Sequence, residues 1–351
     1  MNKIPVSILG ATGMVGQRFV SLLDGHPWFR VAALTGSDRS IGRPYAECCR
    51  WALADPMPEY AKAMVVRPTE PDAESVLAFS ALPADLAREA EPAYAGAGKG
   101  LCSNASAFRA DGDVPLLIPD VNPDHTRLIP VQRKNRGWKG FIVTNPNCTS
   151  TGLTMALRPI LDSFGLRSMF VVSMQAVSGA GYPGVASLDI LDNVIPNIGG
   201  AEEEKVENEP RKMLGKFADG KVVPAPFLAS AHTNRVAVTD GHVVCVSLKL
   251  EQSASPEQIR KAMEDYAFPD AVRGLPSLPS KFIEVRDEPD RPQPRRDRNA
   301  GRGMTAVVGR IRPDPIWDVK FVVLSHNTIR GAAGGALLNA ELLVSQGFIE
   351  R

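Results

Sequence analysis

The chain has 351 residues, of which 44% are hydrophobic and 23% are charged, and its net charge is +1. This length predicts two domains with a sizeable core, and the balanced charge excludes an electrostatic case for binding nucleic acid or an anionic membrane. Five cysteines without metal-type spacing, together with no signal-peptide pattern and no apolar run of membrane-spanning length, predict a cytoplasmic enzyme with no metal site.

A strand, a glycine turn and a helix are predicted at the start of the chain. The apolar run Val6–Leu9 precedes the segment 10–16, GATGMVG, and residues 17–23 continue with helical spacing. Glycines in such a turn let the backbone approach a pyrophosphate, which then lies on the free N–H groups of the helix N-terminus. The GxxGxxG spacing is a common variant of the dinucleotide-binding fingerprint, so we expect a Rossmann-like nucleotide site here.

The end of the second predicted strand, residues 29–35, indicates which nucleotide binds. Domains that bind NAD place an acidic residue there to hold the ribose hydroxyls. In this chain Ser37, Arg39 and Ser40 offer hydroxyls and a guanidinium suited to a 2′-phosphate, which favours NADP. Asp38, an acidic residue in the same segment, keeps NAD binding possible. The alternative is that residues 36–40 form a solvated turn that binds no cofactor.

Further strands alternate with helices or loops up to residue 147. The sequence predicts strands at residues 75–83, 100–106, 116–122 and 141–143. This alternation is typical of an α/β fold with a doubly wound, mainly parallel sheet. The basic stretch 133–139 is expected to be a solvated connection.

Cys148 lies where the apolar run 140–143 passes into a predicted helix at residues 153–157. Free backbone N–H groups and the positive end of the helix dipole gather at such a place. They lower the pKa of a thiol, which favours the reactive thiolate, and they can stabilise an oxyanion on a carbonyl that the sulfur attacks. A buried structural cysteine is the alternative.

The pattern changes after about residue 150, where long apolar or alternating runs predict a second sheet. They cover residues 169–174, 243–250, 305–311 and 319–324. A helix is expected from Ser255 to Tyr266, with Ser255 as its cap, and residues 286–303 are expected to form a polar loop. Strands and helices separated in this way favour an α+β domain.

The C-terminal stretch 327–343 is predicted to be a helix with small residues in its first half, which permit close approach to another backbone. We expect this helix to pack back against the nucleotide domain. The expected division is therefore a Rossmann-like domain at residues 1–147, completed by the C-terminal helix 328–351, and an α+β domain at residues 148–327.

A cysteine nucleophile beside a nicotinamide cofactor suggests an aldehyde dehydrogenase, in which attack on the carbonyl and hydride transfer lead to a thioester. Such a reaction needs a general base. His242 precedes a predicted core strand, where a loop residue can face a cleft. His232 is nearly as good a candidate, and a purely structural histidine is the remaining alternative.

Five motifs resemble one family and occur in its order along essentially the whole chain. They are GATGMVGQRF (10–19), NPNCT (145–149), SMQAVSGAGYPG (173–184), RVAVTDGH (235–242) and HNTIRGAAGGALLNAELL (326–343). Together they resemble aspartate-β-semialdehyde dehydrogenase of the archaeal and fungal type. The resemblance implies NADPH-dependent reductive dephosphorylation of L-4-aspartyl phosphate to L-aspartate 4-semialdehyde and phosphate. That step belongs to lysine, methionine and threonine biosynthesis, and family members are homodimers or homotetramers joined through the catalytic domain, here 148–327.

The resemblance also implies roles for single residues. Cys148 matches the acyl-forming nucleophile, and His242 matches the acid/base. Gln175 matches the glutamine that orients the substrate beside the thiol. Arg235 matches the arginine that holds the substrate carboxylate as a bidentate fork.

Four further residues match the rest of the substrate site. Glu202 and Lys205 match a pair that faces the substrate ammonium and the phosphate, with a register open by one residue, and Arg109 matches the phosphate-site arginine. Asn147 precedes the cysteine as in the aspartate enzymes. The residues that match the family's cofactor contacts are Gly10, Thr12, Gly13, Met14, Val15, Ser37, Arg39, Ser40, Leu82, Ser178, Gly179 and Asn327.

Three other functions stay open at this point. Malonyl-CoA reductase shares much of the scaffold, but its substrate has no ammonium and no use for a glutamate at position 202. Acetylglutamyl phosphate reductase performs the same chemistry on a longer substrate, and the motifs fit it less well. From a different class, the chain could be a non-catalytic NADP(H)-binding protein, although such a protein has no need for the whole set Cys148, Gln175, Arg235 and His242.

Overall fold

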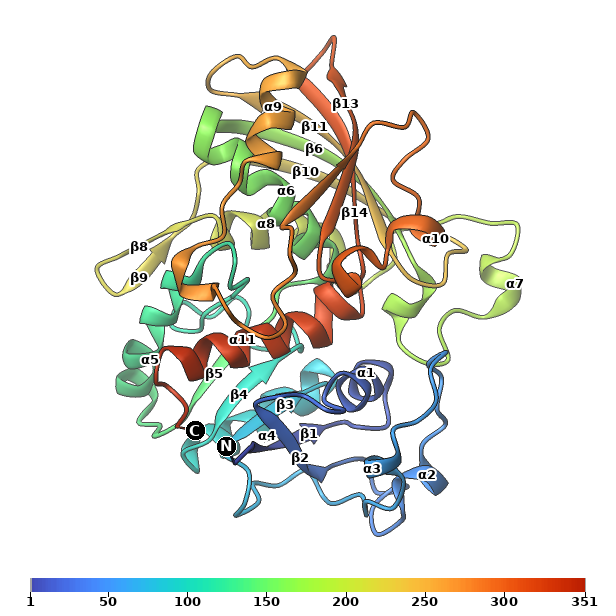
Figure 1. Ribbon diagram of the computed structural model, residues 1–351, viewed down its shortest axis with the longest axis vertical. Helices are drawn as coiled ribbons and strands as arrows, with labels where there is room; N and C mark the ends of the chain where they lie inside the picture. Colours follow the sequence, from blue (N-terminus) through green and yellow to red (C-terminus); the bar gives the residue numbers. More distant parts are fainter. Residues whose placement is uncertain (1, 351) are drawn as a thin grey trace.

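The computed structural model describes residues 2–350, and within them two large β-sheets occupy the two ends of the molecule (Figure 1). The first sheet has five parallel strands in the order β2-β1-β3-β4-β5. Their bounds are β1 (Ile4–Leu9), β2 (Phe29–Leu34), β3 (Leu77–Ser80), β4 (Gly100–Ser103) and β5 (Phe141–Thr144). The expected doubly wound sheet is confirmed. Its order reverses between β1 and β3, and sheets of this kind bind ligands at such a switch point.

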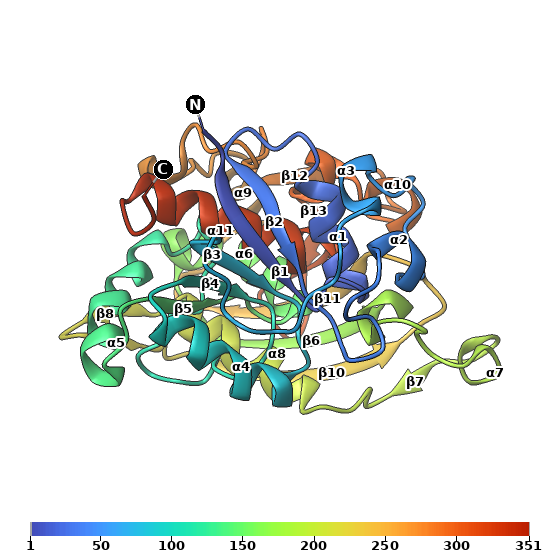
Figure 2. The same ribbon diagram turned by 90° about the horizontal axis from the view of Figure 1, so that it is seen from below.

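Helices cover both faces of the first sheet, as the fully buried strands β3, β4 and β5 require. The helices of this half are α1 (Met14–Leu22), α2 (Tyr45–Cys48), α3 (Glu59–Lys62), α4 (Ala84–Gly96), α5 (Leu128–Arg136) and, from the far end of the chain, α11 (Gly334–Ser345). Phe19 of α1 and Leu338 of α11 share one core with Phe79, whereas Tyr94 of α4 belongs to a second core. Figure 2 shows α11 and α4 on opposite sides of the strands.

The second sheet is mixed and has seven strands in the order β12-β13-β14-β11-β6-β10-β7. The strands of this half are β6 (Leu166–Gln175), β7 (Ile195–Pro196), β10 (Leu228–Arg235), β11 (His242–Leu250), β12 (Ile283–Arg286), β13 (Ala306–Pro313) and β14 (Val319–Ser325), and β8 (Lys216–Ala218) and β9 (Lys221–Val223) form a separate ribbon. The helices are α6 (Cys148–Phe164), α7 (Ser187–Ile190), α8 (Glu202–Met213), α9 (Pro256–Glu264) and α10 (Pro294–Asp297). The apolar faces of α6, α8 and α9 share a core with one face of this sheet.

Two expectations about local structure are wrong, and a third is incomplete. The segment 116–122 is not a strand, because the Asn122 side chain bonds Leu116 O (2.9 Å) and the Ile118 N–H (2.8 Å) and satisfies groups that a strand would pair. The basic stretch 133–139 begins inside α5 rather than in a connection. Residues 286–303 include α10 and the buried carboxylate of Asp297, which Arg291 neutralises, so this segment is more than a polar loop.

The C-terminal stretch is helical but not uniform. A π-helix at Ile329–Ala333 precedes α11, and within it Ala332 departs from helical geometry. Buried Arg330 in this turn pairs with the equally buried Asp120. The turn packs against the loop that carries Cys148, since Asn145 donates to Ala332 O and Gly331 lies against Cys148.

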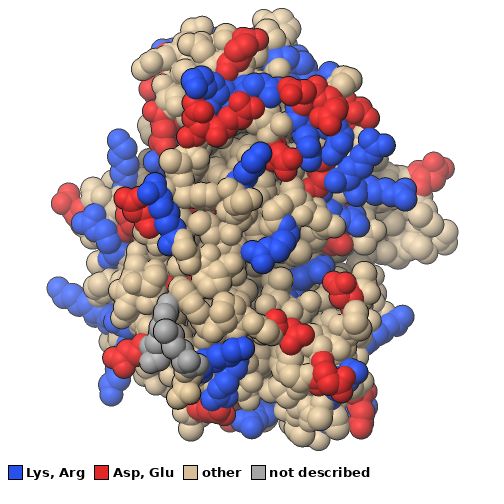
Figure 3. All heavy atoms as spheres, in the orientation of Figure 1, with Lys and Arg blue, Asp and Glu red and all other residues tan. Residues whose placement is uncertain are grey.

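No helix described in the structure is long and apolar enough to cross a membrane. Within residues 2–350 no cluster of His, Cys, Asp and Glu could hold a metal ion. On the face shown in Figure 3, basic and acidic side chains are interspersed, as the net charge of +1 predicts.

Candidate active site

Cys148 is the first residue of α6 and follows the loop that leaves β5. Asn147 caps this helix, since its Oδ1 accepts the N–H groups of Thr149 (2.9 Å) and Ser150 (3.1 Å). Two of the N–H groups that the sequence predicts to be free beside the sulfur are therefore already satisfied. The helix terminus supplies less stabilisation to a thiolate than its position alone suggests.

The structure brings His242, the first residue of β11, to the thiol. Its Nε2 lies 3.1 Å from the Cys148 sulfur, and its Nδ1 accepts the backbone N–H of Ala176 at 3.0 Å. Because Nδ1 accepts, the neutral imidazole carries its proton on Nε2, facing the sulfur. The alternative candidate, His232, is exposed on β10 against Phe170 and plays no part in this cluster.

Burial keeps both groups of this pair neutral. It raises the pKa of the Cys148 thiol to about 12, with nearby Glu202 acting in the same direction and Arg109 and Arg235 against it. It lowers the pKa of His242 to about 3, helped by the charge of Arg235. The expectation of a lowered thiol pKa is therefore wrong for this structure, in which desolvation outweighs the helix terminus.

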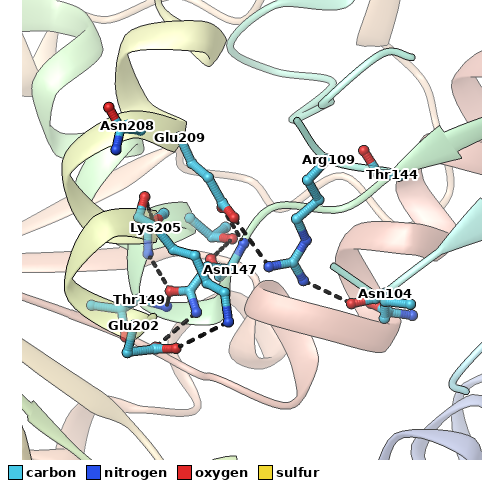
Figure 4. Close-up of polar contacts among 12 residues, drawn as sticks. Asn104, Arg109, Thr144, Asn147, Thr149, Glu202, Lys205, Asn208 and Glu209 are labelled. Atoms are coloured by element: carbon cyan, nitrogen blue, oxygen red, sulfur yellow. Dashed lines mark hydrogen bonds and ion pairs between the residues drawn. The ribbon is translucent and has the colours of Figure 1, made fainter. Parts of the chain in front are cut away.

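Glu202, the first residue of α8, joins the polar groups next to the nucleophile. Its Oε1 accepts from Asn147 Nδ2 (2.7 Å) and Gln175 Nε2 (3.2 Å), and Lys205 Nζ lies 3.9 Å from its Oε2 (Figure 4). Glu203 turns instead to β10, where it accepts the Thr233 N–H. The geometry thus places Glu202 and Lys205, rather than a neighbouring register, beside Cys148.

Arg235 ends β10 beside the same cluster and is 7% exposed. Its Nη1 donates to Ala176 O at 2.8 Å, which leaves other guanidinium N–H groups for a ligand. Gly179 makes room for it, because a Cβ there would lie 2.8 Å from Arg235 Nη1 and 3.1 Å from His242 Cε1. The glycine is thus a steric requirement of the two side chains that flank the thiol.

Arg109 lines the same cleft and lies on the loop after β4. Its Nη2 donates to Asn104 O (2.7 Å) and its Nη1 to Glu209 (3.2 Å), as Figure 4 shows. Glu209 was not among the predicted site residues, although it lies seven residues after Glu202, on the same face of a helix. Burial raises the pKa of Glu209, whereas Arg109 and the N–H of Asn147 act against that rise.

One cleft of about 690 Å³ joins these groups to the glycine turn. Its lining includes the substrate-site residues Arg109, Asn147, Cys148, Gln175, Glu202, Lys205 and Arg235 and the nucleotide-site residues Gly10, Thr12, Gly13, Met14, Val15, Ser37, Leu82, Ser178, Gly179 and Asn327. His242 is not part of this lining, but it contacts Cys148, which is.

Two predicted cofactor contacts, Arg39 and Ser40, do not line the cleft. Arg39 is exposed, and Ser40 is buried beneath Gly36. Thr69, Thr328 and Gly331 line it without having been predicted.

The glycine turn has the shape that a dinucleotide requires. Gly10 has φ +73°, and a Cβ on it would lie 3.0 Å from Ala81 O. A Cβ on Gly16 would lie 2.3 Å from Gly10 O, so the turn and α1 approach closely. No side chain caps the N-terminus of α1, which leaves N–H groups directed at the place where a pyrophosphate binds.

Comparison with known proteins identifies relatives of this chain. Residues 5–129 match the family description "Semialdehyde dehydrogenase, NAD binding domain", and residues 157–330 match "Semialdehyde dehydrogenase, dimerisation domain". The aspartate-semialdehyde dehydrogenase of Archaeoglobus fulgidus is 52% identical, with 99% of this chain and 100% of that protein covered. That of Schizosaccharomyces pombe is 46% identical, with 98% and 99% covered.

Solved structures agree with the sequence relatives. A crystal structure of aspartate semialdehyde dehydrogenase with NADP from Candida albicans has a TM-score of 0.90 at 40% identity and covers 99% of this chain and 100% of its own. The Vibrio cholerae enzyme II complexed with ASA has a TM-score of 0.78 at 26% identity, with 98% and 99% covered.

Proposed function

The chain belongs to the aspartate-semialdehyde dehydrogenase family, and from this premise we propose that it catalyses the NADPH-dependent reductive dephosphorylation of L-4-aspartyl phosphate to L-aspartate 4-semialdehyde and phosphate. The reaction serves lysine, methionine and threonine biosynthesis. The observation that carries the proposal is the contact of 3.1 Å between Cys148 and His242 within a cleft that reaches the glycine turn. A nucleophile and a dinucleotide site in one cleft suit acyl reduction.

The chemistry starts at the Cys148 sulfur. It attacks the acyl carbon of the substrate, the bond from that carbon to the phosphate oxygen breaks, and phosphate leaves with the electron pair and the thiol proton. NADPH, when bound, supplies the hydride that reduces the resulting thioester. The carbon–sulfur bond then breaks to release the aldehyde and leaves a Cys148 thiolate. This thiolate accepts a hydrogen bond from the Nε2–H of His242 and regains its proton from solvent.

The charges around the sulfur complement the charges of the substrate. We assign the substrate carboxylate to Arg235, the ammonium to Glu202, and the phosphate to Lys205 and Arg109. Gln175 holds Glu202 and orients the substrate beside the thiol. All five side chains line the same cleft, which supports this assignment.

We assign the cofactor to the end of the cleft that lies at the glycine turn. The pyrophosphate would lie on the turn at Gly10, Thr12 and Gly13, and Ser37 would meet the adenosine ribose and its 2′-phosphate. Leu82, Ser178 and Asn327 line the same cleft. Asn327 Nδ2 donates to Ser178 Oγ (2.8 Å), which fixes the two residues relative to each other.

We propose that the subunits meet at the open face of the second sheet, which is the face opposite α6, α8 and α9. Cross-strand neighbours His232, Val172, Cys245 and Val322 form a row that no helix covers among the described residues. Partly exposed apolar side chains on a sheet face favour association, and the match to a dimerisation domain spans this sheet. We therefore propose a homodimer through this face, or a homotetramer built from such dimers.

The test is the reverse reaction, with aspartate semialdehyde, phosphate and NADP, followed through the absorbance of reduced cofactor. Malonate semialdehyde with CoA serves as the parallel substrate pair. Phosphate-dependent turnover of the amino substrate supports the proposal. Turnover with the CoA pair alone would move the chain to malonyl-CoA reductase chemistry, and no turnover with either pair would favour the non-catalytic NADP(H)-binding protein.

A further inference from the structure

A buried carboxylate, Glu209, lies directly behind the proposed phosphate site. Glu202, Lys205 and Glu209 share one face of α8 because they are three and seven residues apart. The first two line the active-site cleft, whereas Glu209 is 8% exposed and lines a second cavity of about 640 Å³. Arg109 and Lys205 line both cavities, and of these two Arg109 is the one that contacts Glu209.

Each oxygen of Glu209 has its own partner. Oε1 accepts from Arg109 Nη1 at 3.2 Å, and Oε2 accepts the backbone N–H of Asn147 at 2.5 Å. Arg109 otherwise donates only to Asn104 O among the described residues, and its buried Nε has no partner there (Figure 4). The charge of this arginine therefore faces an internal anion while its remaining N–H groups are free to meet a ligand.

We propose that Glu209 sets the affinity for the phosphoryl group by competing with it for Arg109. This inference rests on the proposed function, which assigns the phosphate to that arginine. Two anions on one guanidinium repel each other, and burial leaves that repulsion weakly screened. Glu209 thus keeps phosphate binding weak and allows the product phosphate to leave.

The charge of Glu209 can be removed while its structural contact is kept. Glutamine has the same shape, and its amide oxygen can still accept the Asn147 N–H, so the segment before Cys148 stays anchored. Asn104 O continues to hold Arg109. The Glu209→Gln variant loses the negative charge beside the guanidinium and also the oxygen that accepts from Arg109 Nη1, because its one amide oxygen stays with the Asn147 N–H.

In the oxidative direction, the KM for phosphate in Glu209→Gln is expected to fall about tenfold, because the competing charge is gone. The KM values for aspartate semialdehyde and NADP are expected to stay unchanged. The matched control is Glu207→Gln on the same helix, since Glu207 also accepts a backbone N–H, that of Ala231, but does not contact Arg109. This control should keep the wild-type phosphate KM.

An unchanged or raised phosphate KM in Glu209→Gln overturns the proposal, and a parallel fall in all three KM values does so too. Glu209→Met removes the same charge with an apolar side chain of similar length and serves if the glutamine variant does not fold. Arg109→Ala separates this proposal from the function itself. If that variant leaves the phosphate KM unchanged, the assignment of Arg109 to phosphate fails; if it raises the KM and Glu209→Gln has no effect, only the role of Glu209 fails.

Discussion

Cys148 and His242 are in contact as a neutral thiol and a neutral imidazole. An ion pair of thiolate and imidazolium would need a proton on both ring nitrogens. The Ala176 N–H occupies the direction of Nδ1 and opposes that proton. Arg235, whose charge lies beside the ring, acts in the same direction. Stabilisation of the thiolate therefore falls to the Nε2–H and to the charges that gather when substrate binds.

This pairing predicts how Cys148 reacts with iodoacetamide in the free enzyme. Only the thiolate reacts, and the thiol pKa is raised to about 12. Below that pKa the thiolate fraction increases with pH, so the inactivation rate is expected to rise about tenfold for each pH unit between pH 7 and 9. The measurement is residual activity against time at each pH, with Cys148→Ser identifying the labelled residue by mass spectrometry.

A rate that is already constant between pH 6 and 8 would contradict this prediction. It would mean that an ion pair of thiolate and imidazolium forms in the free enzyme despite the Ala176 N–H. Repeating the pH series with His242→Ala shows whether the imidazole causes such a plateau, since the plateau would then disappear.

The residues of the site differ in how far the sequence predicted them. Cys148 lies at a strand-to-helix junction, a local pattern that a single segment can reveal. Glu202 was expected only through the family resemblance, with a register open by one residue. Glu209 shares the helical spacing of Glu202, but its partners Arg109 and Asn147 come from distant segments, so nothing local indicated that it is buried with them. Ser40 was predicted to face the cofactor and lies instead beneath Gly36, because the chain turns inward there.

At the scale of elements, the π-helix at Ile329–Ala333 forms the floor under the nucleophile. Asn145, three residues before Cys148, donates to Ala332 O at 2.7 Å, and this bond ties the loop to the π-helix. Gly331 faces Cys148 so closely that a Cβ on it would lie 2.8 Å from the cysteine Cβ and 2.9 Å from its Cα. The small residues of the C-terminal stretch thus serve close approach of two backbones.

Gly331→Ala is expected to reduce kcat at least tenfold, because the added methyl group must displace Cys148 or the π-helix, and overpacking of this kind costs about 1–3 kcal/mol. The measurement is the steady-state rate together with the melting temperature. Gly96→Ala is the control, since nothing lies within 4 Å of a Cβ there and its backbone angles are ordinary for a helix end. Wild-type kcat in Gly331→Ala would show that the loop and the π-helix can separate without effect.

Helices and strands could be predicted from the sequence where a short local pattern determines them. The strand, glycine turn and helix at the N-terminus and the cap at Ser255 follow from short-range spacing, and the structure contains both. The segment 116–122 has strand-like composition, yet the side chain of Asn122 satisfies its backbone instead. The π-helix depends on a buried pair between Arg330 and the distant Asp120, which helical periodicity does not reveal.

At the scale of the whole molecule, the two sheets are joined at the site and by the return of the chain to the first sheet. Glu341 of α11 accepts from the Ser277 hydroxyl (2.5 Å) and pairs with His26 (2.9 Å), which follows α1. This carboxylate links segments from the beginning, the middle and the end of the chain. The cleft between the glycine turn and Cys148 depends on such links, because its two walls come from different sheets.

The open face of the second sheet is the proposed contact between subunits. Val172 lies at the centre of the row formed with His232, Cys245 and Val322, and it is partly exposed in the single chain. An aspartate there meets water in a monomer, but in a dimer closed over this face it would be buried without a partner. Val172→Asp is therefore expected to convert the proposed dimer or tetramer into smaller species, with monomer as the end point for a dimer.

Light scattering coupled to size-exclusion chromatography gives the mass of each species, and circular dichroism shows whether the variant is folded. Ile316→Asp is the matched control, because Ile316 is 82% exposed in the turn between β13 and β14 and lies outside the row. It should keep the wild-type mass. A folded Val172→Asp variant with that same mass would place the subunit contact on another surface, and the open sheet face would then need a different explanation.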